Sequence, residues 1–270
     1  MQMDILSRHS DLIVPLQCLQ EKIVCNIYVI NVSGNMKLFE NKVIVTFGDS
    51  VMKGIVTDSQ CTGELRYVIS DKSFTSICER KLGAKINNYG RFGNTVRRGL
   101  RDIKRHIVQI EDAQYALLEF GGNDSNHDWN AISENPGGDF APDTWPAEFF
   151  AYYKEMIDSV RVAGCTPVVL TLPPIDPLKF FRNITKDFVP DKAGNVLDWL
   201  GGSVTPISNW HEMYNLELYR LAFSCSVPVI DITSCFLSKR NYSDYLCEDG
   251  MHPNEEGHRL ISDAILSANI

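Results

Sequence analysis

VIVTFGDS, residues 43–50, is the stretch of sequence that decides the fold of this chain. Residues 43–47 are apolar or β-branched, which is typical of a strand that is buried on both faces. Gly48 ends this run, and Asp49 and Ser50 are residues that favour turns and helix N-termini. The pattern predicts a central strand of a sheet that helices cover on both sides, followed at once by a sharp turn.

Short apolar runs and longer amphipathic runs alternate on the C-terminal side of this strand. Four more strands are expected, at residues 85–89, 115–120, 166–172 and 228–232. Helices are expected at residues 72–82, 95–108, 146–162, 209–223 and 255–267. Strands that alternate with helices form right-handed crossovers and a parallel sheet. We therefore predict an α/β fold with three layers, α/β/α, around a five-stranded, mostly parallel sheet of the flavodoxin-like kind.

Two segments do not follow this alternation. Residues 1–41 contain β-type runs, especially 22–32, and we expect an N-terminal extension that forms a small β hairpin or packs loosely, beside a domain of residues 42–270. Residues 176–208 are longer than a normal connection between a strand and a helix, and they carry several aromatic side chains. This second segment is interpreted as a lid or as one wall of a pocket, with a plain surface excursion as the alternative.

Composition excludes several classes of protein. Hydrophobic residues make up 44% of the 270 and charged residues 22%, which is typical of a folded globular domain. Because the net charge is −8 and no long basic run occurs, we expect neither nucleic acid nor a membrane as a partner. The eight cysteines form no CxxC pair, and residues 1–15 lack the apolar core of a signal peptide, so we expect reduced thiols and a cytoplasmic location.

Polar groups follow the predicted strands at the points where the strands end. These groups are residues 48–50 after the first strand, 90–95 after the second, 121–124 after the third and 249–254 after the fifth. In open α/β sheets, ligands bind beyond the carboxyl ends of the strands. We therefore expect all four groups to meet at one edge of the sheet.

The residue types in these groups fit nucleophilic attack on an acyl group. A serine hydroxyl is a weak nucleophile until a base removes its proton, and His252 is the candidate base for Ser50. Asp249, three residues earlier on a turn, is placed to accept from the other ring nitrogen and to stabilise the imidazolium. The Asn123 side-chain amide and the backbone N–H groups of Gly93 and Ser50 are candidate donors to the oxyanion. Glycine at 93 also lets the backbone approach the substrate.

Each group alone is common turn chemistry, and only their joint occurrence in this order is informative. The chain resembles the SGNH (GDSL-type) hydrolase superfamily in four blocks: Gly48-Asp49-Ser50, Gly93 within Asn88–Thr95, Gly121-x-Asn123-Asp124, and Asp249-x-x-His252 before Pro253. The resemblance covers about residues 42–270, with Val51 where many members have leucine. It implies a catalytic set of Ser50, Asp249 and His252, and an oxyanion hole of Ser50, Gly93 and Asn123.

A second Asp-x-x-His pattern competes with this assignment. Asp124 is followed three residues later by His127, so His127 is an alternative base. It lies just beyond the candidate oxyanion residue, on a face where substrate should sit. We therefore interpret His127 and Trp129, together with Asp49, as substrate-binding residues.

The resemblance implies a serine esterase that hydrolyses carboxylic esters through an acyl-serine intermediate. The resemblance implies short acyl groups, such as acetyl, on carbohydrates among the possible substrates. The polar, aromatic-bearing loops at residues 127–129 and 143–145 favour a sugar or another small polar ester. The alternatives are a lysophospholipase or thioesterase, acyl transfer to an alcohol, and a non-catalytic binding protein on the same fold. No cofactor or metal is expected, since GxSxG, P-loop and GxGxxG motifs and zinc-type clusters are missing from the sequence. The oligomeric state is not predicted.

Overall fold

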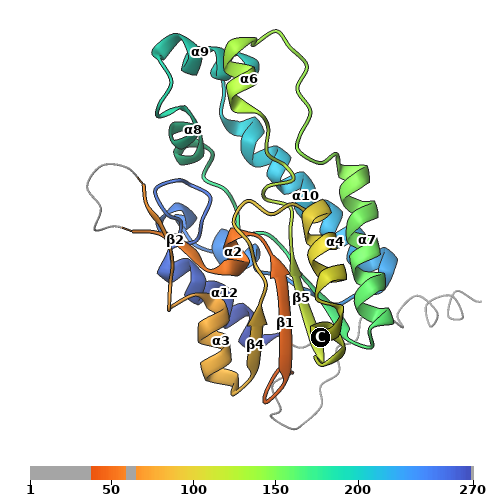
Figure 1. The fold of residues 1–270 in the computed structure, drawn as a ribbon. Coiled ribbons are helices and arrows are strands. Elements are labelled where there is room, and N and C mark those ends of the chain that lie inside the picture. The colour runs from red at the N-terminus through yellow and green to blue at the C-terminus, as the bar shows by residue number, and fades with distance from the viewer. Residues whose placement is uncertain (1–37, 59–64, 269–270) are drawn as a thin grey trace, which may run out of the picture. The chain divides into compact units, whose positions relative to one another are not determined.

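The computed structural model describes residues 38–58 and 65–268. Its centre is a sheet of five strands: β1 (Val43–Gly48), β4 (Lys85–Asn88), β5 (Tyr115–Glu119), β6 (Thr166–Leu170) and β7 (Val229–Ile230). Their order across the sheet is β4-β1-β5-β6-β7, and every neighbouring pair is parallel (Figure 1). Within this sheet β1 comes first along the chain and lies between β4 and β5, which come second and third. This is the flavodoxin-like order, and the predicted fold class is confirmed.

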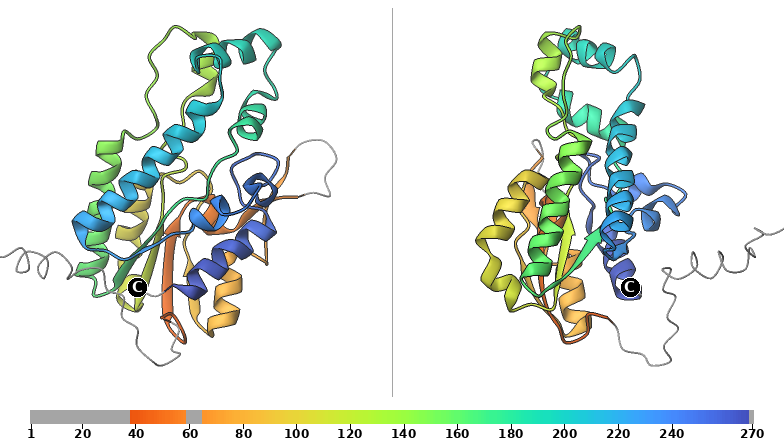
Figure 2. Two further views of the ribbon diagram at one scale, coloured as in Figure 1. Left: turned by 180° about the vertical axis from the view of Figure 1, so that it is seen from behind. Right: turned by 90° about the vertical axis from the view of Figure 1, so that its right-hand side faces the viewer.

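Helices cover both faces of the sheet, as Figure 2 shows. One face carries α4 (Val96–Arg105), α7 (Pro146–Val162) and α10 (Thr205–Cys225), and the other carries α3 (Phe74–Leu82), α11 (Ser234–Leu237) and α12 (Glu255–Ser267). Successive side chains of a strand point to opposite faces. Val45 and Phe47 therefore enter the first core while Ile44 enters the second. The unbroken apolar run of β1 exists because it fills two cores at once.

Three further helices, together with residues 126–128 that lead into the first of them, form what we call the cap. The helices are α6 (Trp129–Glu134), α8 (Pro177–Thr185) and α9 (Pro190–Trp199). They lie beyond the carboxyl ends of the strands, an edge that we call the rim (Figure 1). A third apolar cluster, which includes Trp129, Phe180 and Ile207, joins the cap to the first turns of α10. Residues 176–208 are thus two packed helices and the start of a third, which excludes the plain surface excursion.

Two predicted helices have different bounds in the structure. The helix expected at 95–108 breaks at His106, where the backbone leaves the helical region and the ring packs against Tyr89 at a centroid distance of 4.2 Å. The short α5 (Ile107–Glu111) follows this break. The helix expected from residue 209 begins earlier, at Thr205, because Pro206 in its first turn needs no partner for an N–H group.

Several short elements are absent from the sequence prediction. Strands β2 (Ile55–Thr57) and β3 (Tyr67–Ile69) form a separate antiparallel pair. A four-residue helix, α2 (Ser50–Lys53), follows β1 directly, and a 3₁₀ turn, η1 (Tyr242–Tyr245), precedes the last polar group. Elements of three or four residues are too short for a hydrophobic period to show.

The N-terminal prediction is largely outside the described residues. Residues 1–37, including the expected hairpin, are not among them, so the extension and its boundary stay a prediction. Residues 38–41 form a turn that leads into β1. Within that turn Phe39 is buried, and its ring meets Tyr115 edge-on at 5.0 Å.

Candidate active site

Ser50 is the first residue of α2, and the turn before it explains its position. The Asp49 Oδ1 atom accepts a hydrogen bond from the Val51 N–H at 2.8 Å, which caps this short helix. A Cβ on Gly48 would lie 2.5 Å from the Met52 Cβ and 2.7 Å from the Glu119 carbonyl oxygen. Only glycine therefore allows the chain to turn so sharply from β1 into α2, which leaves the serine hydroxyl at the rim.

Ser50, His252 and Asp249 form one continuous hydrogen-bonded chain. The Ser50 Oγ lies 2.8 Å from His252 Nε2, and His252 Nδ1 lies 2.6 Å from Asp249 Oδ2. Asp249 Oδ1 accepts from the backbone N–H groups of Met251 and His252 at 2.9 and 3.0 Å. The structure thus brings together two residues that are 202 positions apart in the sequence.

Asp249 is held as a carboxylate by its hydrogen bonds. Burial by itself raises the pKa of Asp249, but the His252 ring and the backbone N–H groups of Met251 and His252 outweigh burial and hold that pKa below its ordinary value. Gly250 makes this turn feasible, because it has a φ of 73° and a Cβ there would lie 2.6 Å from the Phe180 backbone nitrogen. A charged Asp249 fixes the His252 tautomer that can accept a proton at Nε2.

Two aromatic rings flank His252, and the sequence prediction did not include either. The Tyr67 ring lies 5.2 Å from the His252 ring, and the Phe92 ring stacks on it at 5.7 Å. Burial and the neighbouring Asp249 carboxylate raise the pKa of Tyr67, so its hydroxyl stays protonated. Phe92 lies within residues 90–95, one of the polar groups that follow the predicted strands. Tyr67 lies on the three-residue strand β3, which is too short for a sequence pattern to predict.

Asn123 is oriented by two acceptors at the rim. Its Nδ2 donates to Asp49 Oδ2 at 2.9 Å and to the Asn94 carbonyl at 3.1 Å. Asp49 is only 3% exposed and lies behind Asn123, so the structure places it as a support of that amide and not at a pocket wall. Gly93 has a φ of 67°, and a Cβ there would meet no protein atom within 4 Å. Glycine is thus required there by the left-handed backbone, while the space above it stays open.

A buried carboxyl pair lies beneath these residues. Burial and the Asp49 carboxylate raise the pKa of Glu119 well above its ordinary value, because two adjacent carboxylates cannot both be charged in such a site. Glu119 therefore holds a proton. Burial raises the pKa of Asp49 as well, but less than that of Glu119, so Asp49 is the first of the pair to ionise and it accepts the Asn123 amide. The pair thus aligns a candidate oxyanion donor.

The alternative base pair, Asp124 and His127, is not assembled. Both carboxylate oxygens of Asp124 lie 3.1 Å from the Val96 N–H at the start of α4. His127 packs among the rings of Trp129, Trp199 and Trp210 at 4.7–5.6 Å, and its Nδ1 has no hydrogen-bond partner. Burial lowers the pKa of His127 to about 4. His127 is therefore a neutral residue of the cap, and Asp124 does not orient it as a base.

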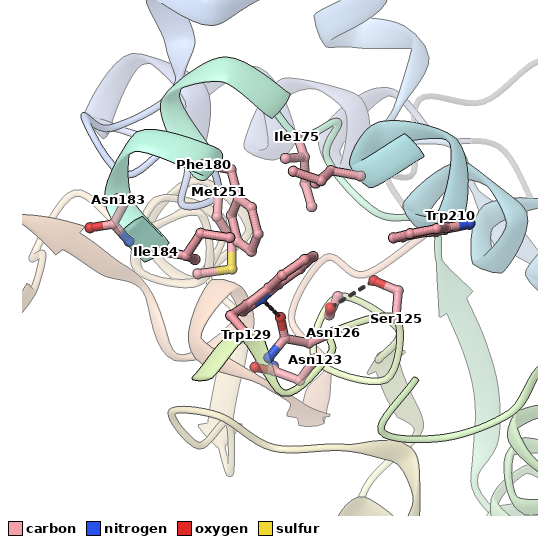
Figure 3. Close-up of a pocket in the computed structure, with 12 residues that line it drawn as sticks. Asn123, Ser125, Asn126, Trp129, Ile175, Phe180, Asn183, Ile184, Trp210 and Met251 are labelled. Atoms are coloured by element: carbon pink, nitrogen blue, oxygen red, sulfur yellow. Dashed lines mark hydrogen bonds between the residues drawn. The ribbon is translucent and has the colours of Figure 1, made fainter. Parts of the chain in front are cut away.

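A pocket of about 150 Å³ lies between the rim and the cap (Figure 3). Asn123 and Gly122 contribute from the rim, and Met251, next to His252, borders it as well. Trp129 lines this pocket, and α8 supplies Phe180 and Ile184. Residues 176–208 therefore contribute a wall of this pocket, and its role in binding substrate stays a prediction. His127 lines a second hollow, which shares Ser125 and Trp210 with the first.

Within residues 38–58 and 65–268, no three His, Cys, Asp or Glu side chains gather as ligands for a metal ion. No helix in this described part of the chain is long and apolar enough to cross a membrane.

Comparison with known proteins places the chain in a family. The model of the GDSL-like Lipase/Acylhydrolase family matches residues 46–260. A search of curated proteins finds no match. The chain belongs to the GDSL-like lipase/acylhydrolase family, and it is a serine hydrolase that acts on ester bonds.

Solved structures with the same fold include esterases and lipases. A lipase/acylhydrolase from Enterococcus faecalis is 18% identical with a TM-score of 0.58, over 83% of this chain and 93% of that one. An acetylxylan esterase from Geobacillus stearothermophilus is 16% identical with a TM-score of 0.54, over 87% and 98%. A member of the lipolytic G-D-S-L family from Veillonella parvula is 17% identical with a TM-score of 0.53, over 84% and 97%. At these identities the likeness is one of fold.

Proposed function

We propose that this enzyme cleaves carboxylic esters through an acyl-Ser50 intermediate, with His252 as general base and Asp249 as the residue that orients it. The observation that carries the proposal is the continuous chain from Ser50 Oγ through His252 to Asp249, with contacts of 2.8 and 2.6 Å. A hydroxyl hydrogen-bonded to a histidine whose other nitrogen meets a buried carboxylate is an activated nucleophile.

The geometry supports two half-reactions. His252 Nε2 takes the Ser50 proton as Oγ attacks the carbonyl carbon, and it then gives that proton to the departing alkoxide. The alcohol leaves, and Ser50 holds the acyl group. A water molecule then attacks the acyl carbon while His252 accepts its proton, and Ser50 departs as the restored hydroxyl. Asp249 stays ionised in both steps and stabilises the imidazolium.

The oxyanion hole would consist of the Ser50 and Gly93 backbone N–H groups and the Asn123 side chain. In the free enzyme both Nδ2 protons of Asn123 are engaged. When Asp49 is ionised, the bond to Asp49 is the stronger of the two, since hydrogen bonds to ionised groups are about twice as strong as neutral ones. We infer that the proton now shared with the Asn94 carbonyl turns to the oxyanion, while Asp49 keeps the amide in place.

The substrates that we propose are short-chain acyl esters, acetyl among them, of small polar or carbohydrate alcohols. The alkoxide must leave beside His252, where the stacked Phe92 ring is 53% exposed. Trp145 and Trp199 line the second hollow, of about 390 Å³, and such aromatic faces suit sugar rings. The likeness in fold to an acetylxylan esterase supports the same substrate class.

The test is hydrolysis of p-nitrophenyl acetate and butyrate by wild type and by Ser50→Ala. We expect the substitution to lower kcat by about 10⁴-fold or more, because it removes the nucleophile. The melting temperature should hardly change, and a fluorophosphonate probe should label wild type alone. Hydrolysis that survives in Ser50→Ala would contradict the acyl-Ser50 intermediate.

A further inference from the structure

The pocket between the rim and the cap has an apolar interior. Its main contributors are Ile175, Phe180, Ile184, Ile207, Trp210 and Met251. In Figure 3 Phe180, Ile184 and Met251 gather on one side, Trp210 stands opposite, and Asn183 points away from the group. The polar side chains at its floor are paired within the protein: Ser125 Oγ donates to the Gly122 carbonyl, and Asn126 Oδ1 accepts from Trp129 Nε1. Such a lining suits a hydrocarbon group more than a sugar ring.

The position of the pocket decides which part of an ester enters it. The leaving oxygen must reach His252 Nε2, and the Phe92 ring that stacks on His252 is 53% exposed. The carbonyl oxygen must reach Asn123, which itself lines the pocket. The acyl carbon therefore lies at the pocket mouth, and the acyl chain has the apolar interior in front of it.

The volume of the pocket limits the length of that chain. An engineered apolar cavity of about 150 Å³ in another protein holds benzene, a ring of six carbons. The pocket here also measures about 150 Å³. An acetyl group leaves most of this space empty, while a decanoyl chain exceeds it.

We propose that this pocket is the acyl subsite, and that it selects unbranched acyl groups of about four to six carbons over acetyl. This inference rests on the proposed acyl-Ser50 mechanism and narrows its substrate class to short apolar acyl esters of a polar alcohol. Two of the residues that impose the limit, Phe180 and Ile184, come from α8 of the cap, which lies outside the family's motif blocks.

The experiment is a series of p-nitrophenyl esters with acyl chains of two, four, six, eight and ten carbons. For wild type we expect kcat/KM to rise by about tenfold or more from acetate to hexanoate and to fall at decanoate. Ile184→Phe fills the pocket, so hexanoate should lose about tenfold or more relative to acetate, which then becomes the preferred ester. Ile184→Ala enlarges the pocket and should move the optimum to octanoate.

Leu178→Phe is the matched control, because Leu178 lies on the same helix but is 47% exposed and does not line the pocket. It should keep the wild-type profile. Retained acetate hydrolysis in Ile184→Phe shows that the variant is folded.

The outcomes separate this inference from the mechanism beneath it. If hydrolysis depends on Ser50 but acetate is the best ester for wild type, or if Ile184→Phe lowers all chain lengths equally, the acyl subsite is wrong while the mechanism stands. A second series of acetate esters of ethanol, butanol and hexanol tests the orientation. If Ile184→Phe changes kcat/KM according to the length of the alcohol and not according to the length of the acyl chain, the alcohol occupies the pocket and the inference fails. If no ester is hydrolysed in a Ser50-dependent way, both proposals fall.

Discussion

The rim and the cap both bury histidine, but they treat it in opposite ways. At the rim His252 is fully buried and both ring nitrogens are paired, one with Ser50 and one with Asp249. In the cap His127 is 7% exposed, lies among three tryptophan rings and has an unpaired Nδ1. A buried polar group normally has its partners, and a network that satisfies every member holds one geometry. The rim is therefore built to hold reacting atoms, while the cap is built to present an aromatic and apolar surface.

The same contrast governs charge. For Asp249 at the rim, hydrogen bonds outweigh burial and the pKa falls. For His127 in the cap, no charged partner opposes burial and the pKa falls because the imidazolium is disfavoured. One residue is thus kept ionised and the other is kept neutral by the balance of two effects. In our proposals the rim carries the chemistry and the cap helps to select the substrate.

Removal of each histidine in turn should give the largest difference in activity between the rim and the cap. We expect His252→Ala to lower kcat on p-nitrophenyl butyrate by about 10⁴-fold or more, because it removes the base. His127→Ala should stay within about tenfold of wild type, since truncation there removes packing and not a proton acceptor. Parallel kinetics on both variants measure the difference. Equal losses would mean that His127 acts as a base and that the assignment to His252 is wrong.

The two regions also each contain an asparagine with a clear hydrogen-bonding role. Asn123→Ala should lower kcat by about 10²–10³-fold with little change in KM, the usual result of the loss of one oxyanion donor. Asn195→Ala is the control from the cap, because Asn195 Nδ2 donates to the Ser133 carbonyl at 2.8 Å and Asn195 lines neither hollow. That variant should lose about 1 kcal/mol of stability but hydrolyse acetate at nearly the wild-type rate. A small effect of Asn123→Ala on kcat would remove this residue from the oxyanion hole.

The smallest effect concerns stability and pH at the rim. Burial, together with the Asp49 and Asp143 carboxylates, raises the pKa of Asp124 to about 7. The folded chain therefore binds a proton near pH 5 that the unfolded chain has released, so this group stabilises the fold at low pH and the stabilisation is lost as pH rises through 7. Relative to Asp124→Asn, wild type should lose about 2–3 kcal/mol of unfolding free energy between pH 5 and pH 8.

Urea unfolding of wild type and Asp124→Asn at pH 5 and pH 8 measures this difference in unfolding free energy. The contribution of His127 to the pH dependence cancels, because both proteins contain His127. A difference that does not change with pH would show that Asp124 is already ionised at pH 5.

Much of the rim could be predicted from the sequence, since each of its groups is a local signal. Residues 43–47 must be apolar on both faces, Gly48 must turn sharply, and the polar residues that follow each strand must share an edge because the strands are parallel. The four blocks therefore pointed to Ser50, Asp249, His252 and Asn123 before any distance was known. The contact between Asp49 Oδ2 and the Asn123 amide was not predicted, because no local pattern indicates it.

The cap was harder to predict, although it left some traces. Asp176 accepts from the backbone N–H groups of Leu178 and Lys179, and Pro177 and Pro190 stand in the first turns of α8 and α9. An Asp-Pro pair of this kind is a signal for a helix start. The cap helices are short, however, and their apolar faces meet side chains from distant segments, so no clear period predicts where they pack.

The sequence by itself determined the fold class and the edge of the sheet at which the polar groups meet, and it predicted the residues that we propose carry the chemistry, because strand patterns and turn residues act over a few positions. Only the tertiary structure decided the pocket. Its walls come from the loops after β5 and β6, from α8, from α10 and from Met251 beside His252, and their spacing depends on how the third apolar cluster packs. Volume between segments is a property of long-range packing, and a linear pattern carries no measure of it.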